Sequence, residues 1–198
     1  MIEFVNVKDE APLIFLIEKY HQAVNANQKN IEALAISSFN KDMNEVDSRF
    51  VNIKFINKDK FIFFSNYNSP KSIAFESHKQ ISGLFFWASI NTQIRLKAKV
   101  KKTSAKFNKQ YFKNRSTEKN ALAISSKQSR SILSYEDVLQ NYNKVHAKNN
   151  LSECPEYWGG YSFIPYYFEF WEGHESRINK REVFYKTDGI WKHSFLQP

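Results

Sequence analysis

Hydrophobic and polar positions along the chain repeat with two different periods. Residues 11–25 repeat apolar side chains at helical spacing, which predicts an amphipathic helix. Residues 92–103 alternate between apolar and basic side chains, which predicts a half-buried antiparallel strand with a solvated basic face. An RNA-binding strand would present the same basic face, so that alternative stays open at this point.

The remaining pattern predicts many short strands joined by turns and short helices. This favours one α+β domain over residues 1–198, mainly an antiparallel β-barrel with peripheral helices. Asp188-Gly189 is typical of a hairpin turn. Strands are expected at 32–39, 49–56, 61–65, 80–87, 161–164, 167–171, 182–185 and 191–195, helices at 71–77, 107–114, 115–124 and 134–148, turns at 40–48, 57–59 and 172–176, and a loop at 149–157.

Composition narrows the class of protein. With 42% hydrophobic and 16% aromatic residues, the chain is expected to fold rather than stay disordered. The single Cys154 excludes a disulfide framework and a multi-cysteine metal site, and the five histidines show no metal-ligand spacing. No apolar run reaches membrane-spanning length and the N-terminus is acidic, so we expect a cytoplasmic protein with no membrane partner.

The net charge of +9 raises the question of a nucleic-acid partner. We interpret this charge as spread along the chain rather than clustered, and most of the basic residues are lysines. No nucleic-acid partner is therefore expected. Only six residues are arginines. Those positions are informative, because only arginine offers a planar fork of donors.

Two stretches have side chains suited to an anion. Arg177, Asn179 and Arg181 follow an aromatic strand at alternate positions, so an extended chain would place all three on one face. Two guanidiniums there suit a phosphate or carboxylate, although a basic sheet edge that resists aggregation would look the same. Lys71 stands at a predicted helix start, where backbone donors can receive a phosphate, although Ser-Pro-Lys also begins ordinary helices.

Four separated motifs carry a resemblance to a known family. WGGY, EFW-x-G and R-x-N-x-R in residues 158–181 are similar to the C-terminal signature of the pyridoxamine/pyridoxine 5′-phosphate oxidases. The R-x-x-x-x-K of residues 49–54, the F-x-S-N-Y-x-S-x-K of residues 63–71 and the stretch 111–129 resemble the family's other motifs, in the same order. Four motifs in order are far more specific than any one of them.

The resemblance implies an FMN-binding split barrel and a homodimer with each flavin bound between subunits. It also implies an oxidase, in which FMN takes hydride from pyridoxamine or pyridoxine 5′-phosphate, dioxygen reoxidises the flavin, and pyridoxal 5′-phosphate and hydrogen peroxide are formed. By resemblance, FMN contacts fall at Arg49, Phe50, Val51, Asn52, Ile53, Lys54, Phe64, Ser65, Lys71, Gln93, Gln128, Ser129, Trp171 and Arg181. Substrate contacts fall at Lys54, Tyr111, Arg115, Lys119, Arg177 and Asn179, of which Arg177 and Asn179 lie nearest the reacting carbon.

Three residues depart from the family pattern. Pro70 stands where a basic residue is usual, Lys119 where the family has a phosphate-binding serine, and Asn179 where it has histidine. These departures keep open an alternative function, a flavin or pyridoxal-phosphate carrier with the same fold and without turnover. A basic RNA-binding barrel is a third possibility. For Tyr111, an aromatic residue packed in the core is the alternative to a substrate contact.

Overall fold

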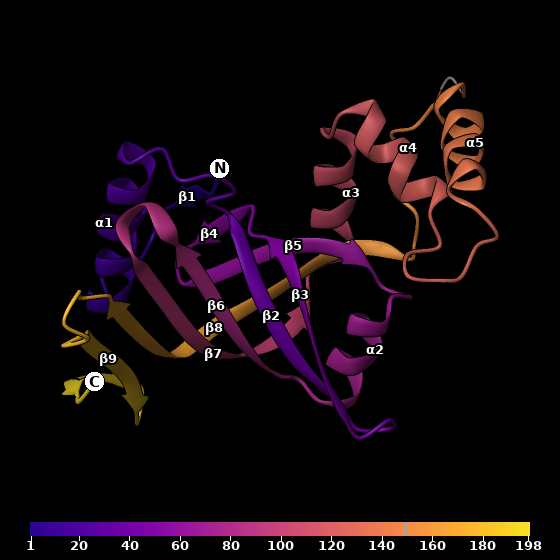
Figure 1. Ribbon diagram of the computed structural model, residues 1–198. Helices are drawn as coiled ribbons and strands as arrows, with labels where there is room; N and C mark the ends of the chain where they lie inside the picture. The colour runs from indigo at the N-terminus through magenta and orange to yellow at the C-terminus, as the bar shows by residue number, and fades with distance from the viewer. Residues whose placement is uncertain (149) are drawn as a thin grey trace.

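A computed structural model describes residues 1–148 and 150–198, and a ten-stranded sheet forms its centre (Figure 1). The hydrogen-bonded order is β1-β4-β5-β8-β7-β6-β2-β3, with β9 pairing to β8 and β10 to β9. All neighbouring pairs are antiparallel except β1 with β4. The strands are β1 (Glu3–Val5), β2 (Ala33–Asn40), β3 (Glu45–Asn52), β4 (Phe55–Asn57), β5 (Lys60–Asn66), β6 (Gln80–Trp87), β7 (Thr92–Lys102), β8 (Trp158–Glu172), β9 (Lys180–Thr187) and β10 (Ile190–Leu196).

Strand β8 connects the two ends of the sheet. Its first half pairs with β5, its second half pairs with β9, and β7 runs beside residues 161–172. The sequence predicted two strands separated by Pro165, and this was wrong, because β8 is continuous. A shift in register opposite Lys97 and Ala98 accommodates the proline, which has no N–H to give to the ladder.

The core between the sheet faces is largely aromatic. Phe61, Phe63, Phe163, Phe168 and Phe170 are each at most 1% exposed. Phe61 and Phe163 stack with ring centroids 5.3 Å apart, as cross-strand partners of β5 and β8. These aromatic residues therefore stabilise the sheet rather than forming a site.

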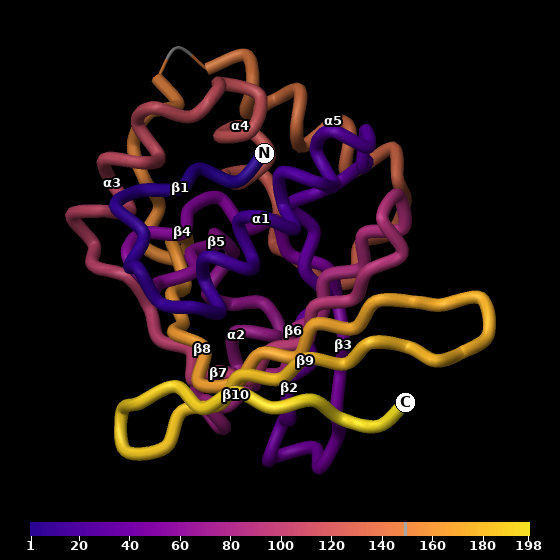
Figure 2. The backbone as a smooth tube through the Cα atoms, turned by 90° about the vertical axis from the view of Figure 1, so that its left-hand side faces the viewer, coloured from indigo at the N-terminus to yellow at the C-terminus, as the bar shows by residue number. Residues whose placement is uncertain are grey.

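Helices cover the sheet at several places (Figures 1 and 2). Helix α1 (Ala11–Asn25) has the predicted bounds and lies at the opposite end of the molecule from the lobe formed by α3 (Ala105–Lys113), α4 (Thr117–Ser125) and α5 (Tyr135–His146). The side chain of Ser134 caps α5 by accepting from Asp137 N. The expected inward face of α5 is not buried, because the helix packs against α4 and no sheet lies behind it. Asn149, in the expected loop 149–157, lies outside the described residues.

Two further predictions are corrected by backbone pairing. Strand β3 begins at Glu45, inside the expected turn, because the backbone of residues 45–48 pairs with β2 although the side chains are exposed. The strand expected over 49–56 breaks after Asn52. There the N–H of Ile53 donates to the carbonyl of Glu32 at 2.9 Å, and the N–H of Lys54 donates to the carbonyl of Ile62 at 2.8 Å.

The C-terminal hairpin is as predicted. Asp188 and Gly189 have φ of 51° and 79°, the left-handed pair that a tight turn between β9 and β10 requires. No helix of the described residues is long and apolar enough to cross a membrane.

Candidate functional site

A cavity of about 490 Å³ lies between the sheet and the helical lobe. It draws together side chains from β3, β5, α2 (Pro70–Ser77), α3 and α4, which are far apart in sequence. Eleven of its lining residues belong to the set expected from the resemblance: Phe50, Val51, Asn52, Lys54, Phe64, Ser65, Lys71, Tyr111, Arg115, Lys119 and Gln128. Asn114, Ser116 and Trp158 also line it and were not expected to.

Stacked aromatic rings form one wall of this cavity. The rings of Phe64 and Tyr111 stack with centroids 3.8 Å apart, and the Trp158 ring lies parallel to both, 5.1 Å from Phe64 and 6.3 Å from Tyr111. The guanidinium of Arg115 lies 4.5 Å from the centre of the Trp158 ring and donates to Asn120 Oδ1 at 3.2 Å. Trp158 opens the WGGY motif, and that position was the signal that could have identified it as a lining residue.

Tyr111 and Arg115 are both half-buried, and both line the cavity. Burial raises the pKa of the Tyr111 hydroxyl, so this group stays protonated and can donate. Burial lowers the pKa of Arg115 from its usual value, but a guanidinium remains charged in proteins. Tyr111 therefore lines the cavity instead of being sealed in the core, which was the alternative left by the sequence.

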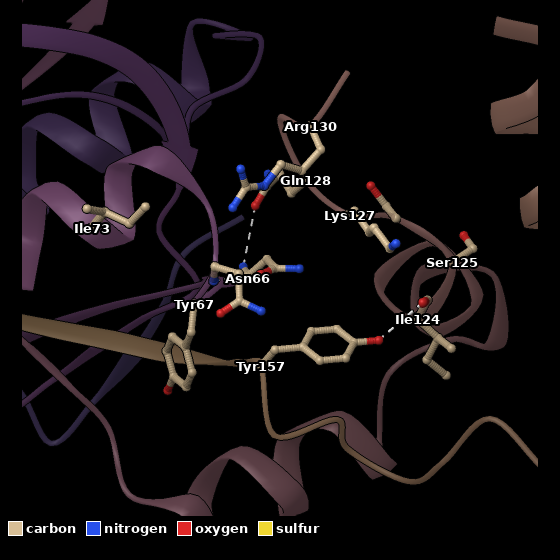
Figure 3. Close-up of a pocket in the computed structure, with 11 residues that line it drawn as sticks. Asn66, Tyr67, Ile73, Ile124, Ser125, Lys127, Gln128, Arg130 and Tyr157 are labelled. Atoms are coloured by element: carbon tan, nitrogen blue, oxygen red, sulfur yellow. Dashed lines mark hydrogen bonds between the residues drawn. The ribbon is translucent and has the colours of Figure 1, made fainter. Parts of the chain in front are cut away.

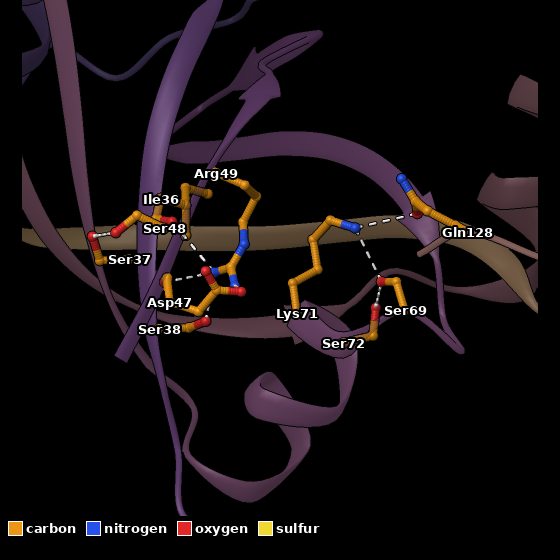
Figure 4. A network of polar contacts seen from close by, with 10 residues as sticks. All are labelled: Ile36, Ser37, Ser38, Asp47, Ser48, Arg49, Ser69, Lys71, Ser72 and Gln128. Carbon is orange, nitrogen blue, oxygen red and sulfur yellow. Dashed lines mark hydrogen bonds and ion pairs between the residues drawn. The ribbon is translucent and has the colours of Figure 1, made fainter. Parts of the chain in front are cut away.

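Lys71 and Arg49 form a cationic corner beside the cavity (Figure 4). Lys71, 9% exposed, donates to Ser69 Oγ at 3.0 Å and Gln128 Oε1 at 3.2 Å, and no carboxylate of the described residues lies within 4 Å of it. Burial, and secondarily the charge of Arg49, lower the pKa of Lys71 to about 8. Arg49 differs, because it already forms an ion pair with Asp47 and donates to Ser38 Oγ at 2.7 Å.

The charge of the cavity lining is of one sign. Four cations, Lys54, Lys71, Arg115 and Lys119, line it together with no carboxylate. Buried or crowded cations repel one another unless an anion neutralises them. The lining therefore suits one or more phosphate groups.

Most of the net charge belongs to the segment that forms the lobe. Residues 101–150 hold eleven Lys and Arg and three Asp and Glu, which gives +8 of the chain's +9. Among the described residues of this segment, Lys102 is the one cation with a carboxylate within 4 Å. The expectation that charge is spread along the chain was wrong. The charge is concentrated in this segment, which supplies Arg115 and Lys119 to the cavity lining, and its field attracts anions.

Three expected residues lie at the other end of β8. Gln93 pairs across the sheet with Trp171, and Trp171 pairs with Arg181. Trp158 and Trp171 are separated by thirteen residues of one strand, so roughly 40 Å lies between them at the usual rise of a strand. Within one chain, the cluster of Gln93, Trp171 and Arg181 therefore cannot reach the cavity.

The loop between β8 and β9 holds the remaining pair of expected residues. Arg177 and Asn179 lie in this loop, and β9 begins only at Lys180, so the prediction that they share a strand face with Arg181 was wrong. Arg177 adopts a left-handed φ of 61°, and its N–H bonds to the carbonyl of His174 at 2.9 Å. Asn179 Oδ1 accepts from the backbone N–H of His174 at 3.1 Å, which ties the loop together.

Besides Arg49, Gln93, Trp171 and Arg181, two further expected cofactor residues lie outside the cavity lining. The side chain of Ile53 is fully buried in the core, and its backbone N–H donates to the carbonyl of Glu32. Ser129 lines a separate cavity between α4 and α5. Another cavity, of about 480 Å³, lies beyond Gln128 and is lined by residues such as Tyr67, Lys127 and Tyr157 (Figure 3). No group of three or more possible metal ligands occurs in the described part of the chain.

Comparisons with known proteins show the fold and the family. The fold class is the FMN-binding split barrel. A solved structure of PhzG from Burkholderia lata 383, in complex with tetrahydrophenazine-1-carboxylic acid, matches with a TM-score of 0.89 over 94% of this chain and 92% of that chain, at 24% identity. A sequence profile described as the pyridoxine 5′-phosphate oxidase C-terminal dimerisation region matches residues 158–198.

Curated relatives define the family. A pyridoxine/pyridoxamine 5′-phosphate oxidase of Leptospira interrogans is 30% identical over 190 residues, covering 94% of this chain and 88% of that protein. One from Pelagibacter ubique is 37% identical over 177 residues, covering 87% and 83%. The chain belongs to the pyridoxine/pyridoxamine 5′-phosphate oxidase family, whose cofactor is FMN. The uncompensated cation at Lys71 and the acid-free cavity lining fit the phosphate of that cofactor.

Proposed function

We propose that this protein is an FMN-dependent oxidase that converts pyridoxamine or pyridoxine 5′-phosphate to pyridoxal 5′-phosphate. The observation that carries the proposal is the lining of the cavity, which combines four cations, stacked aromatic rings and no carboxylate. Both proposed ligands combine an aromatic ring system with a phosphate, and this lining matches those two features. Residues 1–198 act together in the proposal as one domain.

The phosphate groups are held by different residues in the proposed arrangement. Lys71, Arg49 and the start of α2 bind the FMN phosphate, since Lys71 is a buried cation with no ion pair among the described residues. Lys54, Tyr111, Arg115 and Lys119 bind the substrate phosphate; the first three supply donors from partly buried positions and Lys119 adds an exposed charge.

Bound FMN would supply the chemistry, accepting hydride from the C4′ carbon of the substrate and passing two electrons to dioxygen to give hydrogen peroxide. The protein's part is to hold the two rings in a reactive pose and to exclude water. The aromatic wall of Phe64, Tyr111 and Trp158 limits the space open to water. In the proposed arrangement, Arg177 and Asn179 of a second copy approach the reacting carbon, because the loop that holds them follows the far end of β8.

The proposed enzyme is a homodimer with two shared sites. Gln93, Trp171 and Arg181 stand roughly 40 Å from the cavity of their own chain at the usual strand rise, so a second copy must deliver them if they contact the same flavin. Exposed apolar side chains support such a contact: Phe50 is 73% exposed at the cavity, and Phe86 is 54% exposed beside Gln93.

An oxidase assay with added FMN tests the activity, with peroxide release from pyridoxamine 5′-phosphate as the readout. The shared site is tested by mixing two inactive variants, Lys71→Ala and Trp171→Ala, after dissociation and reassociation. A mixed dimer has one site with both wild-type halves, so activity should return to about a quarter of wild type. If each variant is inactive and the mixture stays inactive, although mixed dimers form, the site is not shared.

A carrier of FMN or pyridoxal phosphate is the second candidate function. It is favoured by Asn179, whose Oδ1 is engaged by the loop backbone and whose side chain cannot ionise. Tight FMN binding with no peroxide from either phosphorylated vitamer would decide for the carrier.

A further inference from the structure

A buried carboxylate lies between two arginines on the outer face of the sheet. Glu169 is 2% exposed and stands near the C-terminal end of β8, two residues before Trp171. Its Oε1 accepts from Nε and Nη2 of Arg181, at 3.0 and 2.8 Å. Its Oε2 accepts from Nη1 of Arg95 at 2.9 Å and from the Tyr167 hydroxyl at 2.9 Å.

The sheet register explains why these groups meet. Arg95 lies directly opposite Glu169 on β7. Arg181 lies opposite Trp171 on β9, which makes it the diagonal neighbour of Glu169. Because side chains alternate along a strand, Glu169 and Trp171 project from the same face. The carboxylate therefore joins three strands immediately beside the cluster of Gln93, Trp171 and Arg181.

The contacts of Arg181 leave its guanidinium only partly used. Glu169 takes two of its five N–H groups, and the carbonyl of Gln197 takes a third at 3.0 Å. Two N–H groups remain for another acceptor, and the residue is 26% exposed. A long side chain held at three points loses little further freedom when it binds a ligand.

We propose that Glu169 is a positioning residue for the flavin: it fixes the Arg181 guanidinium so that the remaining N–H groups are presented to FMN in the partner's cavity. The inference rests on the proposed function. Arg95 stabilises the carboxylate through the other oxygen, and its own side chain is 50% exposed. The two oxygens therefore have separate tasks, Oε1 for Arg181 and Oε2 for Arg95 and Tyr167.

A double-mutant cycle on FMN affinity tests this role. Titration of apo dimers with FMN, followed by flavin fluorescence, should show Glu169→Gln and Arg181→Gln each weakening FMN about tenfold, and the double variant also about tenfold. Independent effects would multiply to about a hundredfold, and that result would overturn the proposal. So would wild-type affinity in Glu169→Gln. If the wild type itself binds no FMN, the proposed function fails instead.

Two further variants separate positioning from stability. Asp59→Asn is the matched control, because Asp59 is 7% exposed and ion-paired to Lys8 far from the flavin cluster; it should lower the melting temperature with FMN affinity within about twofold of wild type. Glu169→Asp keeps the charge but shortens the side chain, so it is expected to fold and still bind FMN about tenfold more weakly. Wild-type affinity in the Asp variant would also sink the proposal.

Discussion

The buried cation Lys71 makes a pH-dependent prediction about FMN binding. With a pKa of about 8, this side chain is about nine-tenths protonated at pH 7 and about one-tenth protonated at pH 9 in the apo protein. The FMN phosphate is already about nine-tenths dianionic at pH 7 and almost entirely so at pH 9, because its second pKa is near 6, about that of other phosphomonoesters. If phosphate binding requires the protonated lysine, FMN affinity should fall about tenfold between pH 7 and 9, or about 1.4 kcal/mol.

Stability of the apo protein should change in the opposite direction. The pKa of Lys71 is lower in the folded state than the ordinary value of 10.5, so the unfolded chain binds more protons between pH 8 and 10.5. This group's contribution to the free energy of unfolding therefore rises with pH across that window. The difference between the two pKa values corresponds to about 3 kcal/mol, as an upper bound.

The variant Lys71→Met removes both effects. It should weaken FMN at pH 7, flatten the pH dependence of binding, and raise the melting temperature of the apo protein at pH 7. Apo protein is titrated with FMN from pH 7 to 9, and its melting is followed at each pH without FMN. Lys60→Met, at an exposed lysine on β5, is the control and should keep the wild-type slopes. The reasoning fails if the wild type and Lys71→Met show the same slope of FMN affinity with pH.

Three other predictions follow from the site. Arg49→Ala should weaken FMN binding by about 1.5–3 kcal/mol, whereas Asp47→Asn should tighten FMN binding a few-fold by releasing Arg49. If both variants bind FMN with wild-type affinity, Arg49 does not belong to the site. Asn179→His should raise the rate of peroxide release about tenfold, because an imidazole can ionise; unchanged turnover contradicts this. Lys119→Ser should raise KM for pyridoxamine 5′-phosphate mainly at low salt, with kcat little changed, and the effect should shrink at high salt.

Local pattern predicted much of the fold and part of the site. Helix α1, strand β6 and the Asp188-Gly189 turn depend on side-chain period and turn chemistry, which are local, so their predicted places agree with the structure. The motifs also predicted most of the cavity lining, because their spacing matches the family's. Long-range pairing was not predictable in the same way. Pro165 suggested a break, yet pairing with β7 on one side continues the strand through it.

The sequence by itself determined the family, the chemistry of the side chains and the net charge, since these depend on residue type and order alone. Only the tertiary structure decided how these residues are grouped. It placed Lys71 and Gln128 at one end of β8 and Trp171 and Arg181 at the other, and it buried Glu169 between two arginines. Distance along the chain carries no information about such contacts, because strand order and register bring together residues that the sequence separates.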